Sequence, residues 1–338
     1  MLNMDEQTPG IGRAYLSEPA SPTPVVSGSF YWNGDPSTQG RFLVDPSGPS
    51  QAAQTATFQC TEFSSDRLKG VVNTSWGTTA ALDLYKIDAF TTHTVAHLAN
   101  SWEQLGTMLG HFSVPGRKWI FRGQRDKRWH LESRFHRLGR RDLRTYKMRD
   151  VEELRRLFAA EERTFDTSDP ASLASLIHLG QHHAFPTPWL DWTESAYTAI
   201  FFAFEQRSPA RDDDQFARLY IIETTEWPYA ELRVASLESA VPYVFLSKPL
   251  PQHNRRAVSQ QAVVMATNIA RPEWYITHYG LPVGRAPAIT VIEMPWSLRK
   301  RALAELARMN IGPRQVHGGL DGIGMELSQR YFDPACDQ

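Results

Sequence analysis

The feature that most constrains the fold is a segment, residues 199–204, that would be apolar on nearly every side of a helix. A helix at the surface keeps a polar face, so a helix without one lies inside the protein. Residues 193–196 (Thr, Glu, Ser, Ala) lie shortly before this segment and are typical of a helix start. We therefore expect a helix at the centre of the core, with the other elements packed around it.

The pattern changes along the chain and predicts an α+β protein with two folded parts. Residues 1–24 are rich in Pro, Ser, Thr and Gly, which predicts a flexible tail. Residues 25–90 alternate short strand-like segments with turn clusters, which predicts a small β-rich module for packing or interaction. Residues 101–332 mix helical and strand patterns, so we expect a mixed α+β domain there.

Periodicity predicts the elements of this second part. We expect a helix that begins after Ser101 and further helices at residues 150–165, 170–182, 296–310 and 321–331. Asp321 is expected to cap the last of these helices. Strands are expected at residues 217–223, 257–266 and 288–294.

Composition favours a cytoplasmic protein with a sizeable core. The 338 residues are 41% hydrophobic and 11% aromatic, which is enough for one large core and for two domains. Cys60 and Cys336 are far apart and have no partners at metal-binding spacing, so we expect neither a disulfide framework nor a metal site. Residues 1–10 lack the pattern of a signal peptide, and no run of about eighteen apolar residues occurs. We expect no membrane partner.

One stretch of the chain is strongly basic although the formal net charge is −1. Residues 117–147 contain twelve Lys or Arg and three Asp or Glu. Such a stretch is typical of a surface that binds a phosphate, a nucleotide or nucleic acid. Alternatively, it is a solvated face balanced by the acidic residues between 150 and 162.

Two segments, residues 119–124 and 181–193, place charged or amide side chains beside aromatic residues, Gly or Pro. Strand ends and tight turns of this composition present polar groups to ligands. Arg122 follows an apolar run and precedes Gly123, so its guanidinium can lie at a sheet edge with no following Cβ to block a close approach. The alternative is an Arg paired with a buried carboxylate.

These segments resemble the FRG domain family, named for the Phe-Arg-Gly found here as Phe121, Arg122 and Gly123. Further positions match the family pattern in the same order: Gln124, Trp129, Leu131, Gln181, His182, Pro186, Thr187, Leu190, Asp191, Trp192, Thr193, residues 199–203, Arg256, Gln260, Gln261 and residues 320–322. Trp189 stands where the family usually has Leu, and Ala262 where it usually has Gly. The Ala262 departure puts in doubt any role that needs a close backbone approach there. The resemblance covers residues 101–332.

The resemblance implies an FRG-type fold and a nucleotide ligand. Its Phe-Arg-Gly strand is similar to the first motif of ADP-ribosyltransferases, in which an Arg on the first core strand holds NAD and a later element supplies a catalytic Glu. By that analogy we assign cofactor-binding roles to Arg122, Gly123, Gln124, His182, Trp192, Thr193 and Gln260, and catalytic roles to Asp191 and Glu293. The close Gln-x-Glu or Glu-x-Glu spacing of that superfamily is absent near Gln260 and Glu293.

Several of these residues have alternative explanations. Asp191 can cap the following helix, pair with Arg122 or act as an acid or base. Trp192 forms either a wall for an adenine or nicotinamide ring or part of the core. His182 either contacts a ligand or is structural, and adjacent histidines, which point about 100° apart on a helix, do not favour a metal. Glu293 is alternatively a surface acid at a strand end.

Two functions follow from these observations. The first is an NAD-binding or nucleotide-binding protein, an ADP-ribosyltransferase or NAD hydrolase that serves as a toxin, effector or defence protein. In it, Arg122 holds pyrophosphate, Asp191 or Glu293 steers the ribosyl cation, and Gln260 orients the ribose. The second is a non-catalytic module that binds nucleic acid or an acidic protein partner through residues 117–147.

Overall fold

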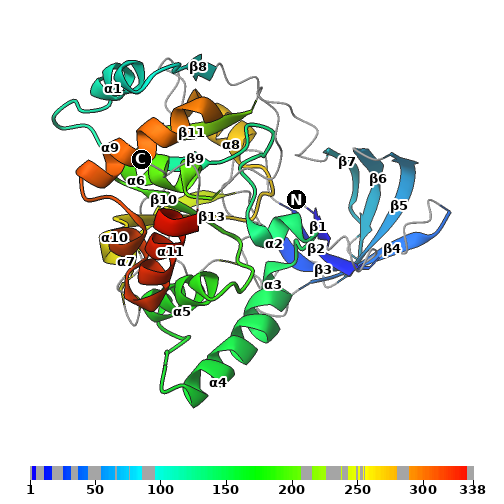
Figure 1. Ribbon diagram of the computed structural model, residues 1–338. Coiled ribbons are helices and arrows are strands. Elements are labelled where there is room, and N and C mark those ends of the chain that lie inside the picture. Colours follow the sequence, from blue (N-terminus) through cyan, green and yellow to red (C-terminus); the bar gives the residue numbers. More distant parts are fainter. Residues whose placement is uncertain are drawn as a thin grey trace.

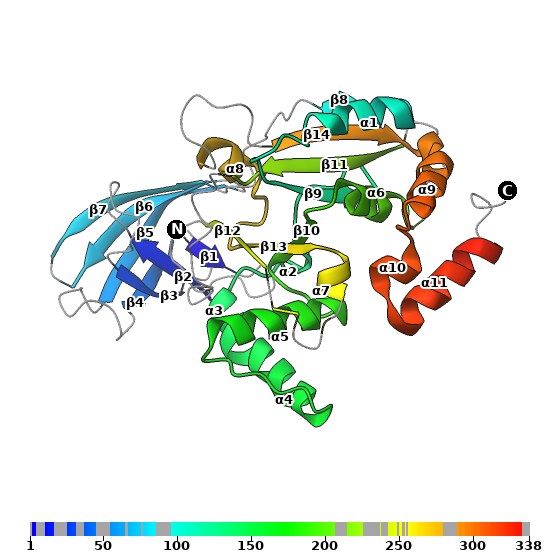
Figure 2. The same cartoon turned by 90° about the vertical axis from the view of Figure 1, so that its left-hand side faces the viewer.

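The computed structural model describes most of the chain from residue 96 onwards and the strands before it. The described residues are 2–4, 11–16, 26–31, 37–44, 55–64, 67–75, 77–85, 96–206, 215–225, 237, 243–248, 250, 251, 254, 256–279 and 289–332. They form an α+β protein with two seven-stranded sheets (Figure 1). In both views the first sheet lies on the opposite side of the molecule from helices α9, α10 and α11 (Figures 1 and 2).

The first sheet is an antiparallel meander in which each strand pairs with the next along the chain. Its strands are β1 (Leu2–Met4), β2 (Ile11–Leu16), β3 (Val26–Tyr31), β4 (Gln39–Val44), β5 (Thr55–Phe63), β6 (Arg67–Thr74) and β7 (Thr79–Tyr85). Burial alternates along β5 and β6, so one face is covered. The β-rich module is therefore present. β1 and β2 fall within residues 1–24, for which the sequence predicts a tail, and β2 pairs with β3.

The second sheet has the strand order β12-β13-β10-β9-β11-β14-β8. Its strands are β8 (Ala96–Leu98), β9 (Trp119–Gln124), β10 (Trp189–Thr193), β11 (Phe216–Glu223), β12 (Val244–Ser247), β13 (Ala262–Thr267) and β14 (Ile289–Pro295). All neighbouring strands are antiparallel except β14 and β8. The strands predicted at 217–223 and 288–294 are confirmed as β11 and β14.

Helix α6 (Ala196–Phe204) lies in the core, as its apolar sequence predicts. Ser195 caps it by accepting a hydrogen bond from the Thr198 amide, and it packs with α1 (Trp102–Gly110), α9 (Arg299–Arg308) and the sheet. It approaches β9 so closely that a Cβ on Gly123 would lie 1.9 Å from the Ala199 carbonyl oxygen. Only glycine fits at this position.

The other helices surround the sheet. Helix α5 (Pro170–His182) has the predicted bounds, because Asp169 accepts hydrogen bonds from its first amides and Pro170 suits the first turn. The remaining helices are α2 (Arg134–Arg137), α3 (Leu143–Thr145), η2 (Tyr146–Val151), α4 (Glu152–Ala160), α7 (Arg256–Ser259), α8 (Glu273–Tyr279), η4 (Trp296–Leu298), α10 (Pro313–His317) and α11 (Gly319–Phe332).

Two local predictions, and one of the alternatives given for Asp191, were wrong. Residues 257–261 are not strand: α7 occupies Arg256–Ser259, and Gln261 has a positive φ of 47°, so β13 begins only at Ala262. Asp321 lies inside α11 and does not cap it. Asp191 lies in the middle of β10, and Ser195 caps the helix that follows.

Candidate functional site

The candidate site lies where β9 and β10 diverge. The two strands pair at Thr193 and Phe121, and their register does not continue toward Asp191. The gap forms a pocket of about 170 Å³ between these strands, α2 and the C-terminal end of α5. Its charged and amide lining comprises Arg122, Glu132, Arg134, Arg137, Gln181 and Asp191. We call it the Arg122 pocket.

Arg122 has donors that no described residue uses. It is half-buried, and its Nη1 donates a hydrogen bond to the Asp191 backbone oxygen. Its Nε is buried and has no hydrogen-bond partner, and no described carboxylate lies within ion-pair distance of the guanidinium. Burial lowers the pKa of Arg122, the Asp191 carboxylate raises it, and the Arg137 cation lowers it further. The predicted alternative, an ion pair with a buried carboxylate, is therefore not seen among the described residues.

Asp191 is held by a short polar chain. The Thr187 hydroxyl donates to Gln181 Oε1, and Gln181 Nε2 donates to Asp191 Oδ2 at 2.6 Å. A carboxylate oxygen accepts and does not donate, so the Gln181 amide nitrogen faces Asp191 and the Gln181 oxygen accepts from the Thr187 hydroxyl. The Asp191 side chain is 50% exposed, and its other oxygen, Oδ1, lies 4.0 Å from His178 Nε2.

Helix α2 brings two further arginines to the pocket. Ser133 caps α2, and Arg134 Nη1 donates to the Ala184 carbonyl oxygen at 2.8 Å. Arg137 is exposed and acts electrostatically on Arg122. Both arginines belong to the basic stretch 117–147, and the sequence predicts no site role for either of them. No periodicity distinguishes them from their basic neighbours.

Three residues of the predicted site lie in structural positions near the pocket. Gly123 faces α6, on the opposite side of β9 from Arg122. Gln124 is buried, and its Nε2 donates to the His130 carbonyl oxygen at 3.2 Å. Trp192 is 2% exposed and belongs to the core cluster of the sheet.

The structure also does not bring Thr193 and Gln260 to the Arg122 pocket. The Thr193 hydroxyl donates to the Gln260 carbonyl oxygen at 2.7 Å, and both residues are buried. Gln260 Nε2 donates to the Val316 carbonyl oxygen at 3.2 Å. These contacts join β10, the turn after α7 and α10.

Glu293 lies on β14, which is separated from β9 by β11. Its carboxylate accepts hydrogen bonds from Arg218 Nε at 3.0 Å and Nη2 at 2.7 Å. Both donors contact the same oxygen, Oε1, and this ion pair joins neighbouring strands directly across the sheet. Glu293 does not line the Arg122 pocket, and its catalytic role stays a prediction.

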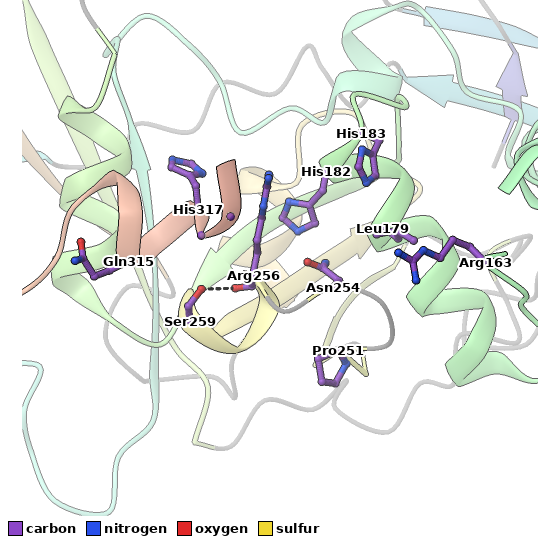
Figure 3. A pocket seen from close by; sticks show the side chains of 12 residues that line it. Arg163, Leu179, His182, His183, Pro251, Asn254, Arg256, Ser259, Gln315 and His317 are labelled. Atoms are coloured by element: carbon purple, nitrogen blue, oxygen red, sulfur yellow. Dashed lines mark hydrogen bonds between the residues drawn. The ribbon is translucent and has the colours of Figure 1, made fainter. Parts of the chain in front are cut away.

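His182 lines a second, larger cavity of about 800 Å³ (Figure 3). This cavity lies beside the C-terminal end of α5, against α7 and the junction of α10 and α11. We call it the His182 cavity. The residues that line the two cavities all fall within 101–332, the part of the chain in which the sequence predicts the site.

Two searches of the described residues gave negative results. The described residues contain no group of three or more His, Cys, Asp or Glu that could hold a metal ion. Among the helices that the structure describes, none is both long and apolar enough to cross a membrane.

Comparison with known proteins identified one family. Residues 117–212 match the family model described as the FRG domain. This segment contains β9, α2, α5, β10 and α6, and therefore every residue that lines the Arg122 pocket. A search of curated proteins and a search of solved structures found no match.

Proposed function

We propose that the part of the chain that matches the FRG domain model binds a nucleotide, with NAD as the first candidate, by holding a phosphate group at Arg122. The observation that supports this proposal is the unused hydrogen-bonding capacity of the Arg122 guanidinium. Burying a cation without a paired anion is costly, and an anionic ligand would offset that cost. A planar guanidinium also suits two oxygens of one phosphate.

The size of the pocket indicates which part of the ligand it would hold. Pockets for whole drug-sized ligands are typically about 300–1,000 Å³. At about 170 Å³, the Arg122 pocket has room for a phosphate and adjoining atoms. The remainder of a dinucleotide would lie outside it. Arg134 and Arg137 at the pocket would add to the attraction for a pyrophosphate.

The Asp191 carboxylate supports a hydrolase or transferase reaction as part of this proposal. In NAD, the bond between ribose C1′ and the nicotinamide nitrogen would break, and nicotinamide would leave with the bonding electron pair. The half-exposed carboxylate that Gln181 orients would stabilise the ribosyl cation. Water or an acceptor nucleophile would then add to C1′ and lose a proton. A cytoplasmic toxin, effector or defence protein could use this reaction.

Calorimetric titration with NAD tests the binding step. Arg122→Lys should weaken NAD binding about tenfold or more, because an ammonium cannot reproduce the paired contacts. Arg117→Lys is the matched control, since Arg117 is exposed, pairs with Glu223 and lies outside the pocket. Equal affinity of the two variants would contradict the proposal. Release of nicotinamide, measured with the same proteins, tests the reaction separately.

The alternative, a module for nucleic acid or an acidic partner, has less support. Several cations of the basic stretch already form ion pairs within the protein: Arg117 pairs with Glu223, Arg128 with Asp126, and Arg140 with Asp150. Salt-dependent binding of a polyanion together with no binding of NAD would favour this alternative.

A further inference from the structure

The His182 cavity has the size and shape of a small-molecule site. Its volume of about 800 Å³ falls within the usual range for ligand pockets, about 300–1,000 Å³. Leu179 and Pro251 provide apolar wall, and Asn254 and Ser259 provide polar groups. The cavity shares no lining residue with the Arg122 pocket.

The ionisable side chains that line this cavity are all basic. Its ionisable side chains are Arg163, Arg256, His182, His183 and His317, and no carboxylate is among the described residues that line it. In Figure 3 the side chain of Arg256 lies beside that of His182. Such a lining attracts anions and repels cations.

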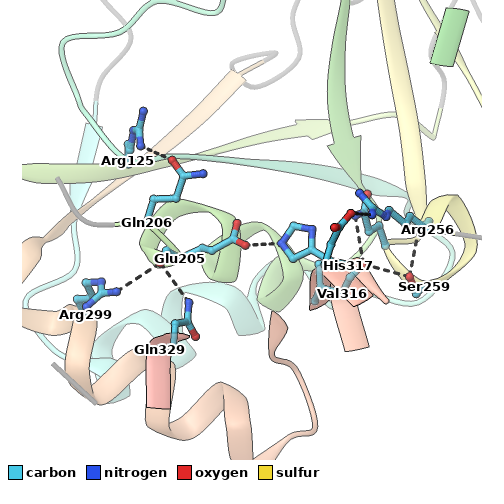
Figure 4. A network of polar contacts seen from close by, with 11 residues as sticks. Arg125, Glu205, Gln206, Arg256, Ser259, Arg299, Val316, His317 and Gln329 are labelled. Carbon is cyan, nitrogen blue, oxygen red and sulfur yellow. Dashed lines mark hydrogen bonds and ion pairs between the residues drawn. The ribbon is translucent and has the colours of Figure 1, made fainter. Parts of the chain in front are cut away.

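The neighbouring acids only partly balance this charge. Arg256 pairs with Asp321, but the Asp321 side chain is 71% exposed, so water weakens that pair. Glu205 contacts His317, and its backbone oxygen accepts hydrogen bonds from Arg299 and Gln329 (Figure 4). Glu205 is buried and does not line the cavity. Among the described residues of the lining, its carboxylate contacts only the His317 ring.

A chain of hydrogen bonds fixes how His182 presents its ring. An amide nitrogen can only donate, so Asn254 Nδ2 donates to His178 Nδ1 at 3.2 Å. His178 Nε2 then carries the proton and donates to His182 Nε2, also at 3.2 Å. His182, when neutral, therefore carries its proton on Nδ1. Its Nδ1–H is a donor for which the structure shows no partner among the described residues.

The junction between α10 and α11 adds a further positive element. Gly318 and Gly319 line the cavity and have positive φ angles of 64° and 56°, a conformation that favours glycine. Helix α11 begins at Gly319, so the positive end of its dipole lies at the cavity wall.

From the one-sided charge, the volume and the oriented His182 ring, we infer that the His182 cavity binds a phosphorylated small molecule of about mononucleotide size. The phosphate lies against Arg256 and His182, and the less polar part of the ligand lies against Leu179 and Pro251. This site is separate from the Arg122 pocket. It does not depend on the function proposed for that pocket.

Calorimetric titration of the full-length protein with AMP, and with adenosine as the uncharged counterpart, tests this inference. The wild-type protein should bind AMP and should bind adenosine at least about tenfold more weakly, because a charge-assisted contact is worth about 1.5–3 kcal/mol. Failure of the wild-type protein to bind AMP, or equal binding of the two compounds, would overturn the inference.

Variants locate the AMP site. Arg256→Gln and His182→Gln should each weaken AMP binding, and Arg256→Lys should retain more affinity than Arg256→Gln because it keeps the charge. The matched controls are Arg301→Gln and His111→Gln, which alter exposed residues outside both cavities. Melting temperatures of all variants identify any loss of folding. If the folded Arg256→Gln and His182→Gln proteins bind AMP like the controls, AMP binds elsewhere and the inference is wrong.

One variant separates this inference from the proposed function. Arg122→Lys should leave AMP binding in the His182 cavity unchanged. If AMP also occupies the Arg122 pocket, the wild-type protein binds two equivalents and Arg122→Lys retains one. Loss of all AMP binding in the folded Arg122→Lys protein would refute the separate site.

Discussion

The two faces of strand β9 serve different purposes, although the residues that define them are neighbours in the sequence. Gly123 faces α6, where no space remains for even a methyl group. Arg122 faces the other way and borders a pocket in which part of its guanidinium has no partner. Packing therefore explains why Gly123 is a glycine, but it does not explain the arginine at position 122.

This difference shows how packing on one face can shape a site on the other. Helix α6 follows β10 in the chain and packs against β9 at Gly123. The same helix therefore sets the positions of both strands, and with them the gap in which Arg122 meets the Asp191 carbonyl group. Changes on the α6 face should affect stability, whereas changes on the Arg122 face should affect binding.

The largest effect is expected for Gly123→Ala. The new Cβ would lie 1.9 Å from the Ala199 carbonyl oxygen and 2.8 Å from the Ala203 nitrogen, and these backbone atoms cannot move independently of α6. Overpacking of this kind should lower the free energy of unfolding by about 3 kcal/mol or more. Denaturant titration measures it. Gly106→Ala is the control, because nothing lies within 4 Å of a Cβ there, and it should raise stability by up to about 1 kcal/mol. Equal stability of the two variants would contradict the packing role of Gly123.

Acid should destabilise the two helices that border the Arg122 pocket. Burial lowers the pKa of His136 on α2 to about 3 and the pKa of His178 on α5 to about 4. The unfolded chain binds these protons near pH 6.5 and the folded protein does not, so stability falls as the pH falls from about 6.5 to about 4. At about 1.4 kcal/mol per pKa unit, His178 accounts for up to about 3 kcal/mol.

Denaturant titrations between pH 7 and pH 4 test this expectation. His178→Gln should lose less stability over this interval than the wild-type protein. His111→Gln, which alters an exposed histidine, should behave like the wild-type protein. An unchanged pH dependence in His178→Gln would show that His178 does not titrate as its burial indicates.

Arg122→Met distinguishes the two faces of β9 most directly. Replacing a buried cation that lacks a carboxylate partner with an apolar side chain should change the free energy of unfolding by no more than about 1 kcal/mol. NAD binding should weaken more than in Arg122→Lys, because the variant lacks both the guanidinium proposed to hold the phosphate and its charge. A protein that unfolds instead would indicate that Arg122, like Gly123, maintains the fold.

The smallest effect on stability is expected for Asp191→Asn. The new side-chain oxygen can still accept the hydrogen bond from Gln181, and the site is half exposed, so stability should change by less than about 1 kcal/mol. Nicotinamide release should cease if the carboxylate stabilises the ribosyl cation. Retained release by a folded Asp191→Asn protein would exclude a catalytic role for Asp191.

The candidate site was only partly predictable from the sequence. Arg122, Gln181 and Asp191 were recognised from their motifs, and the structure places them around one pocket. Gln260 was expected to face the same ligand, but the segment before Ala262 forms a helix and a turn, and the Gln260 amide contacts α10. The sequence places Arg134 and Arg137 in the basic stretch but predicts no site role for them, because a four-residue helix gives no periodicity that identifies its inward face.

The sequence by itself determined the elements whose signals are local. Asp169 and Pro170 define the start of α5, Ser101 caps α1, and the apolar residues of α6 require burial, because caps and helical faces depend on residues a few positions apart. Only the tertiary structure decided which distant residues share a cavity. The gap between β9 and β10 depends on how closely α6 approaches Gly123, and the His182 cavity depends on where α10 and α11 meet α5. Such positions follow from packing among many side chains, which no single segment of the chain specifies.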